Sequence, residues 1–115
     1  SYPTDISDIN LRAMSTLKKE TECLIGLSDH TTSALVPALA VALGAVMIEK
    51  HFTIDVAQEG PDHHMSLNPS DFKKMVVNIV LAEAALGPGT KSVSSCEERT
   101  VKIKDARTAW RERNP

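Results

Sequence analysis

The chain has 115 residues, of which 42% are hydrophobic and 24% charged, a composition typical of one small globular domain. Its 13 basic and 15 acidic residues give a formal net charge of −2, so the basic excess expected of a nucleic-acid-binding protein is missing. The sequence holds no uncharged apolar run of about 18 residues, and it opens without a basic stretch followed by an apolar one. We therefore expect a cytoplasmic protein that binds neither nucleic acid nor a membrane.

Two features of the composition concern the core and a possible site. Aromatic residues make up only 3% of the chain, so the core is expected to consist of Leu, Val, Ile, Met and Ala side chains. The histidines are crowded into the middle third of the sequence, at His30, His51, His63 and His64. Because imidazole is a frequent metal ligand and acid–base group, this crowding is the first indication of a functional site.

The N-terminal part of the chain predicts a helix followed by a buried strand. Apolar residues recur at helical spacing over residues 11–17, and Ser7 or Asp8 is expected to cap this helix. The apolar run over residues 23–27 then predicts a buried strand whose carboxyl end opens into a polar loop. With only two, widely separated cysteines we expect no disulfide framework, and we expect the thiol of Cys23 to be buried with its strand.

A second helix and a second strand are predicted next. Residues 33–44 are almost all small and apolar, which favours a tightly packed helix that ends at Gly44. Residues 46–52 predict an apolar strand that again ends in ionisable side chains, although an unbroken helix from Gly44 to Phe52 remains an alternative. A polar loop over residues 55–66 follows.

The last predicted element has the clearest start signal in the sequence. Asn68 is expected to be the N-cap of a helix, with Pro69 at its first position and Asp71 in its first turn. Gly87 ends this helix, whose apolar stripe consists of Phe72, Met75, Val76, Ile79 and Val80. The charged segment that follows, residues 92–115, is expected to be a linker or tail of uncertain structure.

The element order is helix, strand, helix, strand, helix, which predicts an α/β fold with parallel strands and flanking helices. In such sheets the loops at the carboxyl ends of the strands carry the chemistry. His30 and His51 each follow a predicted strand and lie 21 residues apart, one strand–helix–strand repeat. The two imidazoles could thus share one divalent metal ion. The alternative is that a backbone carbonyl satisfies each ring separately.

Other combinations near these strands are weaker candidates. The adjacent Ser28, Asp29 and His30 do not form a catalytic triad, because consecutive strand residues point to opposite faces. The same alternation places Glu49 on the side of His51.

Lys50 is expected on the opposite side, toward the helices, as a solvated or salt-bridged residue rather than a catalytic amine. The adjacent His63 and His64 lie in the polar loop and are expected to form an exposed turn.

Seven short motifs closely resemble, in order and spacing, the sialic acid synthase family, which comprises N-acetylneuraminate synthase and its legionaminate, pseudaminate and spore-coat polysaccharide relatives. The resemblance covers residues 1–91. The motifs are Tyr2-Pro3-Thr4, Asn10-Leu11-Arg12-Ala13, Gly26-Leu27-Ser28-Asp29-His30-Thr31, Ala42-Leu43-Gly44-Ala45, Glu49-Lys50-His51-Phe52-Thr53-Ile54-Asp55, Gly60-Pro61-Asp62-His63 and Ser66-Leu67-Asn68-Pro69.

The resemblance implies a fold and a reaction. Residues 1–91 would form the C-terminal part of a (β/α)8 TIM barrel, about its last three βα units, and residues 92–115 would lie outside it. The family condenses phosphoenolpyruvate with an N-acyl aldose such as N-acetylmannosamine, and the products are a nine-carbon 2-keto sugar acid and phosphate. A divalent metal, Mn2+ or Mg2+, lies at the barrel mouth and polarises the aldehyde.

The resemblance also implies roles for individual residues. His30 and His51 match the two metal-binding histidines and are therefore the expected catalytic residues. Ser28 matches a serine near the phosphate of phosphoenolpyruvate. Tyr2 and Asp62 match positions of the substrate pocket, where the carboxylate of Asp62 would accept hydrogen bonds from sugar hydroxyls.

The chain departs from the family in its extent. A full barrel needs eight strands and about 250 residues, and the family lysines and acidic residue of earlier strands have no counterpart here. We therefore expect the transferase activity to be incomplete in this chain alone. The alternative is a catalytically inactive module that binds metal or self-associates through exposed barrel edges, and in either case a homo-oligomer is expected.

Overall fold

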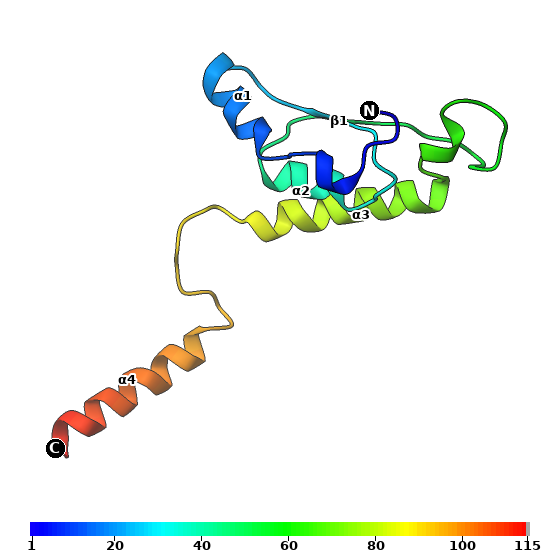
Figure 1. Ribbon diagram of the computed structural model, residues 1–115. Coiled ribbons are helices and arrows are strands. Elements are labelled where there is room, and N and C mark those ends of the chain that lie inside the picture. The colour runs from blue at the N-terminus through cyan, green and yellow to red at the C-terminus, as the bar shows by residue number, and fades with distance from the viewer. Residues whose placement is uncertain (115) are drawn as a thin grey trace.

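A computed structural model describes residues 1–114 of the chain (Figure 1). It has an α/β fold in which helices and strands alternate as predicted. The elements in chain order are η1 (Ile6–Asp8), α1 (Ala13–Thr21), β1 (Leu27–Asp29), α2 (Val36–Ala42), β2 (Ile48–Lys50), η2 (His63–Met65), α3 (Pro69–Leu86) and α4 (Glu98–Arg113), where η marks a 3-10 turn.

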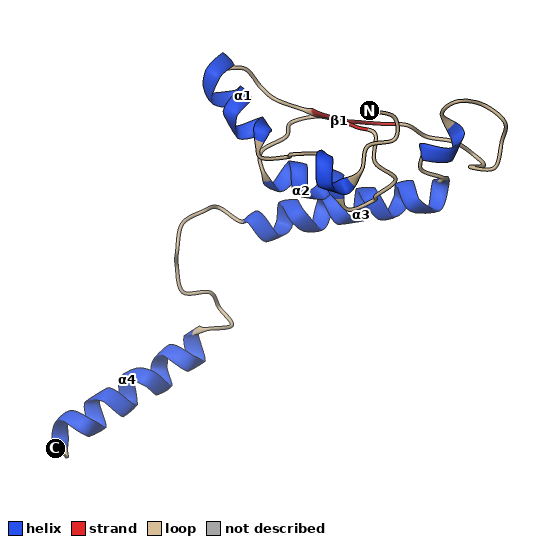
Figure 2. Ribbon diagram, in the orientation of Figure 1, coloured by secondary structure: helices blue, strands red, loops and turns tan. Residues whose placement is uncertain are grey.

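The two strands form a parallel sheet with α2 as the crossover between them. Residues of β1 and β2 pair in the register Leu27 with Ile48, Ser28 with Glu49 and Asp29 with Lys50. Helices α2 and α3 pack together and lie along one side of the strands, which leaves the other side without a helix (Figure 2). The strand at residues 48–50 excludes the alternative of an unbroken helix from residue 44 to residue 52.

The core lies between the sheet and α2 and is built from aliphatic and sulfur-containing side chains, as the low aromatic content predicts. Met14, Ala40 and Ala45 form its buried centre, and further apolar residues pack around it, namely Leu11, Ile25, Leu27 and Ile48. Gly26 permits the close approach of the two chain segments, because a Cβ atom there would lie 2.8 Å from the carbonyl oxygen of Met47.

The structure corrects the predicted boundaries in the N-terminal part. Ser7 and Asp8 lie in η1 and do not cap α1, which begins only at Ala13 after Asn10 turns the chain with a φ of 45°. The first strand also begins later than predicted, at Leu27, and Cys23 is exposed rather than buried. Glu22 ends α1 in the left-handed region, with a φ of 56°, and the paired register with β2 begins only at Leu27, opposite Ile48.

The C-terminal segment extends away from the rest of the chain (Figure 1). Although the charged tail gave no sequence signal for an element, residues 98–113 form the helix α4, and none of its residues is buried. The described residues therefore extend over 76 Å in the longest dimension. Within residues 1–114, no helix combines the length and the apolar character needed to cross a bilayer.

The cap of α3 gives a stability prediction. The side-chain oxygen of Asn68 accepts a hydrogen bond of 2.9 Å from the backbone N–H of Asp71, as the sequence predicted. Asn68→Ala removes this acceptor, and we expect the free energy of unfolding to fall by about 1 kcal/mol. Chemical unfolding followed by circular dichroism measures the loss. Asn68→Ser should retain most of the stability, and an alanine variant as stable as the parent would contradict the role of the cap.

Candidate functional site

Three rings converge at the carboxyl ends of the two strands. His30 follows β1 and His51 follows β2, and their ring centroids lie 5.1 Å apart. The Tyr2 ring comes from the N-terminal segment and lies 4.0 Å from the His30 ring and 6.1 Å from the His51 ring. The backbone N–H of Thr4 donates to the carbonyl oxygen of His30 at 2.9 Å, which ties this segment to the end of β1. The sheet thus brings both predicted metal-binding histidines to one place.

A short hydrogen-bond chain leads from the strands to His30. The hydroxyl of Ser28 donates to Glu49 Oε1 at 2.6 Å, and Ser28 Oγ lies 3.0 Å from His30 Nε2. An ionised carboxylate only accepts, so the single hydroxyl proton points at Glu49 and the serine oxygen is left to accept from the Nε2–H of His30. His30 Nδ1 then carries the ring lone pair, and this atom is buried without a hydrogen-bond partner.

The contact between Ser28 and His30 is a feature that the sequence reasoning missed. The three residues do not form a triad, since the Asp29 carboxylate lies on the opposite face and is bonded to Lys50 rather than to the imidazole. The same alternation that separates consecutive residues brings residues two apart onto one face, so it could have predicted that Ser28 and His30 meet.

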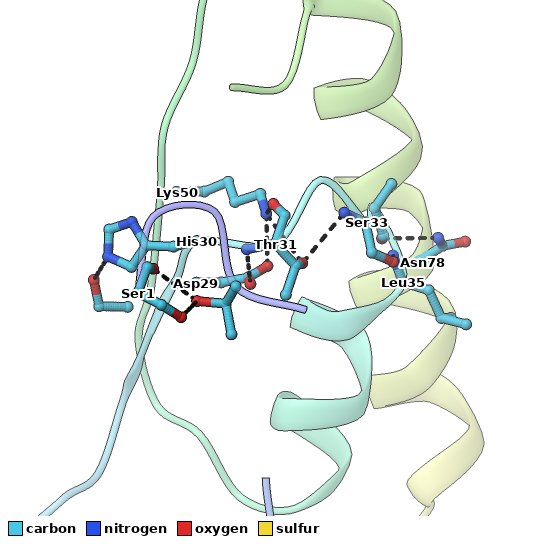
Figure 3. A network of polar contacts seen from close by, with 11 residues as sticks. Ser1, Asp29, His30, Thr31, Ser33, Leu35, Lys50 and Asn78 are labelled. Atoms are coloured by element: carbon cyan, nitrogen blue, oxygen red, sulfur yellow. Dashed lines mark hydrogen bonds and ion pairs between the residues drawn. The ribbon is translucent and has the colours of Figure 1, made fainter. Parts of the chain in front are cut away.

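On the helix-facing side of the sheet, Lys50 forms the ion pair that the sequence left open as one of two possibilities. Its ammonium group lies 2.7 Å from Asp29 Oδ2, and the two side chains are 2% and 0% exposed, so this lysine is not solvated. Figure 3 shows the Lys50 side chain reaching toward Asp29 and Thr31, whereas the ring of His30 points away from the helices. The helix-facing side of the strand pair therefore carries the buried ion pair, and the opposite side carries the imidazole of His30.

The loop after β2 closes the other side of the site. Asp62 Oδ2 lies 3.9 Å from His51 Nδ1, and the two side chains are 55% and 30% exposed. The predicted exposed turn is correct for His64 and wrong for His63. His63 is half-buried because its Nδ1 lies 2.7 Å from the hydroxyl of the buried Thr53, so it anchors the loop that carries Asp62.

The donor set suits a shared metal site. Among residues 1–114, no cluster of three or more His, Cys, Asp or Glu residues could hold a metal ion by itself. The two converging imidazoles are nevertheless ligands of the type that transition metals prefer, and the buried Nδ1 of His30 has no hydrogen-bond partner among the residues that the structure describes. The residues therefore fit a divalent ion that takes its remaining ligands from elsewhere.

Comparison with known proteins gives a consistent result. The NeuB family model matches residues 1–91. The chain is 48% identical, over 84% of its length, to the N,N'-diacetyllegionaminic acid synthase of Legionella pneumophila. It is 40% identical, also over 84% of its length, to the N-acetylneuraminate-9-phosphate synthase of Homo sapiens.

A solved structure is similar in fold. The N-acetylneuraminic acid synthetase of Leptospira borgpetersenii, crystallised with citrate, superposes with a TM-score of 0.79 at 37% identity, over 91% of this chain and 37% of that chain. The chain spans only 27% of each of the two synthases above. It thus corresponds to about a third or less of the length of these relatives.

The hydrogen-bond chain at His30 predicts a tautomer. In the metal-free chain, neutral His30 should carry its proton on Nε2, because Ser28 offers that nitrogen only an acceptor. Nitrogen chemical shifts of the labelled imidazole measure the tautomer directly. Ser28→Ala should weaken the preference, whereas Ser70→Ala, on the exposed start of α3, should leave it unchanged. A parent chain with the proton on Nδ1 would contradict this assignment.

Proposed function

The chain belongs to the NeuB family, and we propose that it supplies the metal-binding part of a sialic acid synthase-like active site. The proposed reaction condenses phosphoenolpyruvate with an N-acyl aldose of the N-acetylmannosamine type, giving a nine-carbon 2-keto sugar acid and phosphate. The observation that carries the proposal is the convergence of His30 and His51, whose ring centroids lie 5.1 Å apart at the carboxyl ends of parallel strands.

The fold supports a place for this chain in a larger barrel. Two parallel strands with helices on one face are the arrangement expected of a segment of a (β/α)8 barrel, in which the helix-free face of the strands would line the interior. We propose that residues 1–91 are about the last three βα units of such a barrel, and that residues 92–115 lie outside it. Ser28 and Glu49 are exposed on the helix-free face, as residues that line a shared interior would be.

The proposed cofactor is Mn2+ or Mg2+, held by His30 and His51. When bound, the ion acts as a Lewis acid and makes the aldehyde carbon of the acceptor sugar more electrophilic. Neutral imidazoles suit this task because they leave the positive charge of the ion intact. Two carboxylate ligands would cancel it. The Tyr2 ring lies beside both imidazoles, tilted by 49° to the His30 ring and at 82° to the His51 ring.

Two polar side chains around the histidines are proposed to bind the substrates. The carboxylate of Asp62, 55% exposed, can accept hydrogen bonds from sugar hydroxyls beside His51. The hydroxyl of Ser28 lies on the same face as His30 and can turn from Glu49 to donate to a phosphate oxygen. Tyr2, at 66% exposure, offers an aromatic wall and a phenolic hydroxyl to the same pocket.

Self-association is the remaining part of the proposal. Within residues 1–114 the sheet has two strands, and no further strand pairs with the outer edge of β1 or β2; the apolar side chains of Val46, Met47 and Ile54, which flank β2 in the sequence, are exposed. Unpaired strand edges readily pair with another chain. We propose that the chain forms a homo-oligomer. Its molecular mass in solution should therefore exceed that of the monomer.

The metal site is tested by Mn2+ binding, followed by electron paramagnetic resonance of the free ion. His30→Ala and His51→Ala should each abolish stoichiometric binding, because the chain supplies only two imidazole ligands to the ion. His64→Ala is the matched control, since this exposed ring lies outside the site, and it should bind Mn2+ as the parent does. Unchanged binding in both site variants would refute the assignment.

The reaction is tested by phosphate release from phosphoenolpyruvate in the presence of N-acetylmannosamine and Mn2+. The chain alone should show no turnover, because the barrel needs more strands than it supplies. Adding a separately produced N-terminal barrel segment of the Legionella pneumophila synthase should restore turnover, and His51→Ala should remove it again. A stable complex of the two pieces that releases no phosphate would contradict the proposal and favour an inactive binding module.

A further inference from the structure

We propose that Asp29 and Lys50 are positioning residues, and that their buried ion pair holds His30 and His51 converged before any metal arrives. The inference rests on the proposed function, because it assigns a purpose to the pair within the same site. Neither side chain belongs to the proposed ligands or substrate-binding residues. Both lie on the opposite face of the strands.

The strand register links the ion pair directly to the imidazoles. Asp29 and Lys50 are paired across the two parallel strands, and each immediately precedes one of the site histidines. Because successive residues point to opposite faces, a bond between Asp29 and Lys50 on the helix side fixes the spacing of the next residues on the other side. Any separation of the pair would move the two rings apart.

The ammonium group of Lys50 holds the chain on both sides of His30. It donates to Asp29 Oδ2 at 2.7 Å and to the carbonyl oxygen of Thr31, and it lies 3.5 Å from Thr31 Oγ1. The other oxygen of the carboxylate, Asp29 Oδ1, accepts from the backbone N–H of Thr31 at 2.9 Å. The residues before and after His30 are thus bonded to one group, which comes from the strand of His51.

The burial of this ion pair indicates that it fixes the strand register more than it raises the free energy of unfolding. The side chains of Lys50 and Asp29 are 2% and 0% exposed, so both charges have lost their water. Replacing a buried ion pair by well-packed hydrophobic residues of similar volume is often neutral or stabilising. A directional pair does, however, define a register, and strands of three residues have few backbone hydrogen bonds to define it otherwise.

Further hydrogen bonds connect the pair to the helices. Thr31 Oγ1 accepts from the backbone N–H of Ser33 at 3.2 Å, and Ser33 Oγ accepts from that of Leu35 at 3.1 Å, at the start of α2. Asn78 of α3 donates to the carbonyl oxygen of Ala34 at 3.1 Å. Figure 3 shows these bonds running from Asp29, Lys50 and Thr31 toward the two helices, so the backbone on both sides of His30 is held from the packed side of the molecule.

The decisive variant is Asp29→Asn/Lys50→Met in the whole chain, which removes both charges and nearly preserves both shapes. We expect it to stay folded, with a thermal midpoint close to that of the parent. Nuclear Overhauser contacts between the ring protons of His30 and His51, present in the metal-free parent, should be lost. The affinity for Mn2+ should fall by about 10- to 100-fold, as on loss of other supporting contacts around metal ligands.

The matched control is Asp71→Asn/Lys74→Met, the same change at the exposed ion pair of α3, whose atoms lie 2.9 Å apart. It should change neither ring contacts nor Mn2+ affinity. A folded Asp29→Asn/Lys50→Met variant with parental ring contacts would overturn the proposal. The ring contacts are measured without metal, so failure of the parent to bind Mn2+ would refute the proposed function while this test still stands.

A second variant covers the case in which the first one unfolds. Asp29→Asn/Lys50→Gln keeps hydrogen-bonding groups at both positions and removes only the charges. If it folds, loss of the ring contacts supports the proposal, and their retention overturns it. If both double variants unfold while the control stays folded, the pair serves folding as a whole and the positioning role is overturned.

Discussion

The parallel pairing of β1 and β2 determines where the side chains of the candidate site lie. Each strand has only three residues, yet their register decides which side chains share a face and which residues follow at the same edge. The crossover through α2 brings residues 21 positions apart in the sequence into lateral contact. Without this pairing His30 and His51 would be two unrelated histidines in a small protein.

The strand pair divides the molecule into two chemically different sides. On the helix side lie the aliphatic core and the ion pair of Asp29 with Lys50, both shielded from water. On the other side lie Ser28 and Glu49, exposed and hydrogen-bonded to each other. A folded chain that leaves one face of a parallel sheet uncovered is unusual, since such sheets are normally buried on both faces.

Much of the fold could be predicted from local signals. The alternation of apolar runs with helical segments predicted the α/β class, and the Asn68-Pro69 start signal predicted the start of α3. The end of α1 could not be predicted, because Glu22 adopts a left-handed conformation that its residue type does not favour. The strand near Cys23 was placed too early because an apolar run indicates burial only where a partner covers it.

The candidate site was accessible to sequence reasoning only in part. The position of His30 and His51 at strand ends, 21 residues apart, predicted that the two rings lie together. The family resemblance added Tyr2, Ser28 and Asp62. The ion-pair partner of Lys50 could not be predicted from the sequence. Identifying Asp29 requires the register of the two strands, which is a property of the folded sheet. The anchoring of His63 by Thr53 likewise depends on how the loop closes.

Two imidazoles on neighbouring parallel strands are proposed to bind one cation. Anomalous diffraction from crystals of the chain soaked in Mn2+ would locate that ion without reference to catalysis. We expect a single strong peak within bonding distance of both His30 and His51. A peak bonded to only one of these rings, or a saturating soak with no peak between them, would contradict it.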